Sequence, residues 1–76
     1  MTEYRVFSQL IKDSENGEYE AFGIAAVCSG EVMFSVGDIS GSFEEVSSLA
    51  ALFNEEVLSP LHLENAVEDF LYDRKV

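Results

Sequence analysis

Basic residues are scarce in this sequence, whereas acidic residues are abundant. Four Lys and Arg stand against 15 Asp and Glu, which gives a formal net charge of −11 at pH 7. Nucleic acids and anionic membrane surfaces are polyanions, so this charge argues against either as a direct ligand. The stretch from Asp13 to Asp73 contains no Lys or Arg and holds 14 of the 15 acidic residues. The few positive charges lie near the two ends.

Cysteine and histidine each occur once. A single cysteine, Cys28, excludes an intramolecular disulfide and a metal site built from several thiolates. A zinc site normally takes three or four converging His, Cys or carboxylate ligands, and His62 is the only histidine available. No set of nucleophile, base and acid typical of an active site is present. We therefore expect no enzymatic activity, no metal and no other cofactor.

Export signals and long apolar runs are also missing. Residues 1–5 lack the basic region and the following apolar region of a secretory signal. No apolar run approaches the roughly 20 residues that a membrane helix needs. The sequence therefore predicts a protein of a reducing compartment, the cytoplasm.

What the sequence does contain is a strand pattern followed by a helix pattern. β-Favouring residues predict three strands, at residues 4–11, 18–28 and 31–38, separated by turns at Asn16-Gly17 and Ser29-Gly30. The hydrophobic content of 47% is too high for a disordered chain. A three-stranded antiparallel meander is therefore expected.

Two helices are predicted after the strands. The sequence Ser42-Phe43-Glu44-Glu45 matches a capping box, and apolar residues then recur at helical spacing as far as Val57. Ser59-Pro60 predicts the start of the second helix, with serine as the cap and proline in the first turn. The expected fold is a single α+β domain over residues 1–76, in the order β-β-β-α-α.

If both turns are two-residue loops, the strand pairing decides which side chains share a face of the sheet. Ile11 would then face Phe22, and Ala25 would face Phe34. Small side chains on the central strand leave room for helices, which favours that face as the core. This predicted core face consists of Val6, Leu10, Gly23, Ala25, Val27, Val32, Phe34 and Val36.

The opposite face of the predicted sheet is also apolar, although a solvated sheet face should be polar. One explanation is that the helices straddle the sheet edge, or that the register is wrong by one residue, which would exchange the faces. The other is an exposed patch that binds a partner or a second copy of the chain. The predicted patch consists of Phe7, Ile11, Phe22, Ile24 and Met33.

Acidic residues recur along both predicted helices at like-charge spacings, such as Glu64 with Glu68. Such a pair costs about 0.2–0.5 kcal/mol, and no Lys or Arg offsets it before Arg74. These faces either keep the protein in solution or form a surface that competes with a polyanion. The predicted acidic partner-binding residues are Glu44, Glu55, Glu56, Glu64, Glu68, Asp69 and Asp73.

Three segments, taken together, resemble a family of short uncharacterised proteins, a domain of unknown function found in Gram-positive anaerobes. They are residues 19–24 (YEAFGI), residues 36–40 (VGDIS), and residues 58–63 (LSPLHL) leading into residues 67–71 (VEDFL). The resemblance covers nearly the whole chain. It implies the fold and a cytosolic setting and assigns no activity.

The function predicted is that of a non-enzymatic protein-interaction module. It would bind a protein partner through the acidic helices, the apolar sheet face, or both. One alternative is a nucleic-acid mimic that inhibits a basic nucleic-acid-binding enzyme, as in inhibitors of bacterial defence nucleases. Another is a homo-oligomeric, for example homodimeric, structural or regulatory protein whose sheet face is the interface. No direct contact with nucleic acid or membrane is expected.

Overall fold

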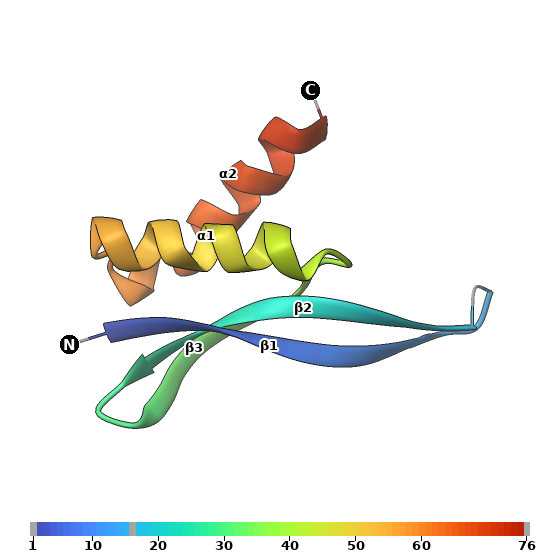
Figure 1. The fold of residues 1–76 in the computed structure, drawn as a ribbon, viewed down its shortest axis with the longest axis horizontal. Helices are drawn as coiled ribbons and strands as arrows, with labels where there is room; N and C mark the ends of the chain where they lie inside the picture. The colour runs from blue at the N-terminus through green and yellow to red at the C-terminus, as the bar shows by residue number, and fades with distance from the viewer. Residues whose placement is uncertain (1, 16, 76) are drawn as a thin grey trace.

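The computed structural model describes residues 2–15 and 17–75, with side chains as far as Asp73. The elements follow the predicted order: β1 (Thr2–Asp13), β2 (Gly17–Cys28), β3 (Glu31–Ser40), α1 (Phe43–Glu56), the 3₁₀ turn η1 (Pro60–His62) and α2 (Leu63–Lys75). The strands form one antiparallel sheet in the order β1-β2-β3. Both helices lie on the same side of this sheet, and the tip of the β1–β2 hairpin extends beyond them (Figure 1). The predicted α+β fold is confirmed.

The first hairpin differs from the prediction in its register. Asp13 pairs with Gly17, so residues 14–16 separate the two strands in place of the two-residue loop Asn16-Gly17; Asn16 itself lies outside the described residues. Gly17 takes a left-handed φ of 80°, which glycine adopts at little cost. Ile11 therefore pairs with Tyr19 and not with Phe22.

The second hairpin begins as predicted and then departs from it. Cys28 pairs with Glu31 and Val27 with Val32 across a turn in which Ser29 and Gly30 both have positive φ. Met33 is then an extra residue, because Val32 pairs with Val27 whereas Phe34 pairs with Ala26. This β-bulge moves Ala25 from the predicted Phe34 to Ser35.

Together, these two register changes turn β2 over relative to the prediction. Ile24 and Ala26, predicted to lie on the uncovered face, are fully buried beneath the helices. Gly23 and Ala25, predicted to lie in the core, are on the uncovered face. The physical cause is the two-residue period of a strand, in which an odd shift moves every side chain to the opposite face. Val6 on β1 and Phe34 and Val36 on β3 keep their predicted side.

Helix α1 begins at the predicted cap. The Ser42 hydroxyl oxygen accepts a hydrogen bond from the Glu45 backbone N–H at 3.3 Å. The Glu45 carboxylate accepts a hydrogen bond from the Ser40 hydroxyl at 2.6 Å, and the same hydroxyl oxygen accepts from the Ser42 N–H at 3.1 Å. The start of α1 is therefore fixed to the end of β3.

Helix α1 ends, and the next helical turn begins, at the predicted residues. Val57 closes α1 in the left-handed conformation. Pro60 lies in the first turn of η1, as predicted, but the Ser59 side chain makes no capping hydrogen bond, which corrects its predicted role as the cap. The Ser59 carbonyl instead accepts a hydrogen bond from the His62 N–H at 2.9 Å.

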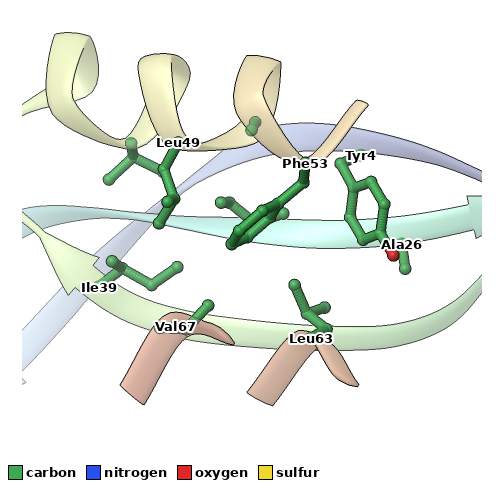
Figure 2. Close-up of a cluster of buried hydrophobic side chains, with 10 residues drawn as sticks. Tyr4, Ala26, Ile39, Leu49, Phe53, Leu63 and Val67 are labelled. Atoms are coloured by element: carbon green, nitrogen blue, oxygen red, sulfur yellow. The ribbon is translucent and has the colours of Figure 1, made fainter. Parts of the chain in front are cut away.

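The core lies between the sheet and the two helices (Figure 2). The Tyr4 and Phe53 rings meet edge to face with centroids 5.6 Å apart. Leu63 and Val67 extend towards them from α2, and both are 1% exposed. The buried cluster comprises Tyr4, Ile24, Ala26, Ile39, Val46, Leu49, Ala50, Phe53, Leu63 and Val67. Removal of these apolar side chains from water is the main contribution to the free energy that holds the helices on the sheet.

A side-chain amide clamps the outer edge of β1 to α1. Asn54 accepts a hydrogen bond from the Tyr4 N–H at 2.8 Å and donates one to the Tyr4 carbonyl at 3.0 Å. The amide thus satisfies both backbone groups of Tyr4 in the way that a neighbouring strand would. The Tyr4 hydroxyl donates to the Leu58 carbonyl, and burial raises the pKa of this phenol. Tyr4 therefore joins the edge strand to the segment between the helices.

Asn54→Ala is expected to lower the free energy of unfolding by about 1–3 kcal/mol, because it removes both partners of the partly buried Tyr4 backbone. Denaturant unfolding measures this change. Asn54→Asp is the matched variant, since it retains the acceptor and loses the donor. Its second carboxylate oxygen would face the Tyr4 carbonyl oxygen in place of the amide donor, so this variant should be no more stable than Asn54→Ala. Equal stability of all three proteins would show that the clamp contributes nothing.

Candidate interaction surfaces

The face of the sheet opposite the helices carries an apolar surface. We call it the open face and define it by Phe7 and Ile11 on β1, Ala25 and Val27 on β2, and Val32 on β3. Phe7, Ala25, Val32 and Ser35 line a shallow depression of about 270 Å³ on it. Val32 is 62% exposed, whereas Phe7, Ile11 and Val27 are half-buried. The open face therefore offers apolar contact area without a helix over it.

Part of the open face is covered by side chains of β1. A Cβ atom added to Gly23 would lie 2.6 Å from Phe7 Cζ, so the Phe7 ring rests over this glycine. Gln9 lies over Gly37 in the same way, and its Oε1 accepts a hydrogen bond from the Asp38 N–H at 2.9 Å. Tyr19 donates to Asp38 Oδ2 at 3.1 Å, and this bond raises the pKa of the phenol. These contacts hold the irregular segment of β3 at Asp38, where φ is 50°.

The open face carries Asp13 and Asp38 in addition to an ion pair between Glu3 and Arg5. The Arg5 guanidinium donates to the Glu3 carboxylate at 2.9 Å. This contact lowers the pKa of Glu3 and raises that of Arg5, because each partner stabilises the charged form of the other. Both side chains are well exposed, so the pair contributes little to stability.

A second apolar surface lies in a groove beside the two helices. We call it the helix groove; its volume is about 460 Å³ and its lining is Ser42, Glu44, Glu45, Ser48, Leu49, Leu52 and Phe70. Leu49 and Leu52 line it from α1 and Phe70 lines it from α2, whose C-terminal half leads away from the sheet (Figure 1). Leu49 is buried at its base and Leu52 is 46% exposed.

The rim of the helix groove is acidic. Glu44 and Glu45 lie on the α1 side. Asp73 follows Phe70 by three residues, which places it on the same side of α2. Among the side chains described on the two helices there is no Lys or Arg. Apolar side chains and carboxylates therefore occur together in one groove.

The structure places the predicted acidic residues as follows. Glu44, Glu55 and Glu56 are exposed on α1, and Glu64, Glu68, Asp69 and Asp73 are exposed on α2. Of these seven, only Glu44 lines the helix groove. Sequence patterning does not identify the groove itself, because Leu52 and Phe70 have the spacing of ordinary core residues. In the structure Leu52 is exposed and Phe70 is half-buried, and both line the groove.

The predicted apolar patch is divided between the two faces. Phe7 and Ile11 lie on the open face, and Met33 is exposed in the bulge of β3. Phe22 and Ile24 lie on the helix-covered side, where Phe22 packs edge to face on Phe43 at 5.5 Å. The grouping of these five residues is therefore wrong, and Ala25, Val27 and Val32 replace Phe22 and Ile24 on the open face.

Within the part of the chain that is described, no three His, Cys, Asp or Glu side chains come together in a group that could hold a metal ion. His62 is exposed in η1. Neither helix, over the residues described, has the length and apolar character to cross a membrane.

Comparison with known proteins adds one match. Neither a curated protein nor a solved structure matches the chain significantly. The model of DUF6514, a family of unknown function, matches residues 1–73. The chain therefore belongs to the DUF6514 family.

Proposed function

We propose that this protein is a non-enzymatic interaction module that binds a basic protein partner in the helix groove. The observation that carries the proposal is the combination of Leu49, Leu52 and Phe70 with the acidic rim of the same groove. Apolar side chains provide most of the free energy of such an interface. Complementary charge accelerates association and selects the partner.

The charge distribution supports a basic partner. The net charge is −11, and the described side chains of both helices contain acids without bases. A positively charged protein would therefore be steered towards the helices, with association rates that fall as salt rises. The acidic residues Glu55, Glu56, Glu64, Glu68 and Asp69 contribute to this field without lining the groove.

The module would act in the cytoplasm of a Gram-positive anaerobe. This setting follows from the resemblance and from the single cysteine, Cys28, which is a free thiol. Reducing compartments favour proteins without disulfides.

The test uses a synthetic amphipathic peptide of Lys and Leu, with Leu at helical spacing, and a scrambled peptide of the same composition. The wild-type protein should bind the first peptide more tightly than the scrambled one, with an affinity that falls as salt rises. Leu52→Ser and Glu44→Lys should each weaken binding about tenfold, as measured by calorimetry. Leu61→Ser is the control, because Leu61 is 76% exposed and lies outside the groove.

Equal binding of the two peptides, or equal affinity of Leu52→Ser and the wild type, would overturn the groove as the binding site.

The mimic of a nucleic acid remains the second candidate, because Glu64 and Glu68 are both exposed one turn apart on α2. A mimic requires charge alone. Loss of binding to a basic nuclease in the double variant Glu64→Lys/Glu68→Lys, with full binding by Leu52→Ser, would favour the mimic.

A further inference from the structure

We infer that the free edge of β3 binds an extended segment of another protein, which adds a fourth strand to the sheet and carries an apolar residue next to a basic one. The site is separate from the helix groove and does not depend on it. β3 pairs with β2 alone and so ends the sheet. In an antiparallel pair, alternate residues direct their backbone N–H and C=O groups away from the paired strand. An added strand forms its hydrogen bonds with these outward groups.

The two edges of the sheet differ in how far they are covered. On β1 the Asn54 amide pairs with both backbone groups of Tyr4. On β3, within the described part of the chain, no backbone hydrogen bond joins residues 31–36 to η1 or to a helix. Edge strands are commonly protected by Lys, Pro or a covering segment, and β3 contains neither Lys nor Pro. Its consecutive residues Val32, Met33 and Phe34 are apolar and between 43% and 62% exposed.

A small cavity beside this edge offers a place for one side chain of the added strand. We call it the edge pocket; its volume is about 110 Å³, and its lining is residues 34–36 of β3 with Pro60, Leu61, Leu63 and Glu64. A cavity above one face of a strand meets alternate residues. Contact with three consecutive residues therefore indicates that the edge pocket reaches the free side of β3. η1 and the start of α2 form its other wall.

The geometry of β3 limits the added strand to a short contact. The bulge at Met33 and the left-handed φ of Asp38 bound the regular part of the edge, so backbone pairing is confined mainly to residues 34–36. Few backbone hydrogen bonds are available, and the edge pocket must supply part of the affinity. Alternate side chains of an added strand point to the helix-covered side, where Leu61 is 76% exposed and free to cover one of them.

Charge around the edge pocket selects a basic segment and disfavours a second copy of this chain. Glu64 lines the pocket, and Glu31 is exposed at the start of the same strand. Arg5 and Lys12, the basic residues whose side chains the structure describes, lie on β1 at the opposite edge. Pairing of β3 with β3 of a second copy would add Glu31 and Asp38 to an edge that is already acidic. A Lys or Arg next to the apolar residue would instead form an ion pair with Glu64.

Binding of a synthetic peptide to the full chain, measured by calorimetry, tests the inference. The probe is a short peptide in which Val and Lys alternate. Two derivatives carry N-methyl groups, one on the Val amides and the other on the Lys amides. Alternate amides of a strand point to the same side, so one derivative should lose about tenfold or more in affinity and the other should bind like the parent peptide.

Variants of the protein locate the site. Leu61→Ser should weaken binding of the parent peptide about tenfold, and Glu64→Gln about threefold at low salt. Both side chains are exposed, so the variants should remain folded, which circular dichroism verifies. Glu68→Gln changes the same charge on α2 outside the edge pocket, and Leu52→Ser changes the helix groove; both should bind like the wild type. The helical Lys and Leu peptide should show the reverse dependence on Leu52 and Leu61, so failure of one site leaves the other standing.

Three results would overturn the inference. Equal affinity of the two N-methylated peptides would exclude strand addition. Unchanged binding by Leu61→Ser would exclude the edge pocket. A mass that rises above 8.4 kDa with concentration in sedimentation equilibrium for the wild type, but not for Leu61→Ser, would identify a second copy as the occupant in place of another protein.

Discussion

Ile24→Ala is expected to lower the free energy of unfolding by about 2–5 kcal/mol. Ile24 lies on the central strand, is 0% exposed and is one of the largest fully buried side chains. Its truncation removes apolar contacts and leaves a cavity that the rigid sheet fills poorly. A domain of 76 residues has a total stability of about 4–11 kcal/mol. The variant should therefore unfold at a much lower denaturant concentration than the wild type.

Met33→Ala is the matched control for Ile24→Ala. The register predicted from the sequence places Met33 and Ile24 on the same face of the sheet. In the structure Met33 is 55% exposed in a bulge. Truncation of Met33 should change stability by less than about 0.5 kcal/mol, as surface substitutions generally do. Urea unfolding of both variants at low protein concentration measures the contrast. Similar losses in the two variants would contradict the observed register.

The order and type of the elements follow from local patterns, whereas the register does not. The Ser29-Gly30 turn and the Ser42 cap are local features, and both lie where the sequence places them. The pairing of Asp13 with Gly17 depends on a choice between a two-residue and a three-residue loop, which differ little in local free energy. Burial of Ile24 and Ala26 against the helices favours the three-residue loop, and this is a tertiary effect.

The orientation of β2 also depends on contacts that no local pattern contains. Small residues on the central strand suggest room for a helix, but Gly23 is small because the Phe7 ring and the Val36 carbonyl approach it. Ala25 and Val27 then follow Gly23 onto the open face. The bulge at Met33 has no glycine or proline to indicate it. Neither feature has a local signal in the sequence.

The exposure of the seven acidic residues was predictable from the sequence, whereas the helix groove, which only Glu44 among them lines, was not. The sequence itself shows that Lys and Arg are absent between Asp13 and Asp73. In the structure the seven predicted acidic residues are all exposed. The helix groove depends on how α1 and α2 are placed relative to each other, which leaves Leu52 exposed and Phe70 half-buried beside the core. The angle between two helices is determined by how their side chains pack against each other, and an amphipathic sequence pattern does not specify it.

Gly23→Ala is expected to destabilise the protein by about 3 kcal/mol or more, beyond the usual cost of an added methyl group in a packed site. The added Cβ would lie 2.4 Å from the Val36 carbonyl oxygen, 2.6 Å from Phe7 Cζ and 2.9 Å from Gly37 Cα. Two of these three atoms are backbone atoms of the neighbouring strand. They can move only if the β2–β3 pairing opens. Thermal unfolding followed by circular dichroism measures the loss.

Gly41→Ala is the control for the removal of a glycine as such. Its added Cβ would meet only the Glu20 carbonyl oxygen, at 3.7 Å, which is an ordinary contact. Gly41 is not among the residues with positive φ, so alanine fits its backbone and restricts the unfolded chain. This variant should be as stable as the wild type or more stable by up to about 1 kcal/mol.

The double variant Gly23→Ala/Phe7→Ala shows which of the close contacts determines the cost at Gly23. Phe7→Ala removes the ring and leaves the Val36 carbonyl in place. If the backbone contact dominates, the two losses should be nearly additive, with a coupling energy below about 0.5 kcal/mol. If the ring is the main obstacle, the double variant should be markedly more stable than the sum of the single variants predicts. We expect near-additivity, because the phenyl ring lies on the open face and can rotate away, whereas the carbonyl belongs to the strand next to β2.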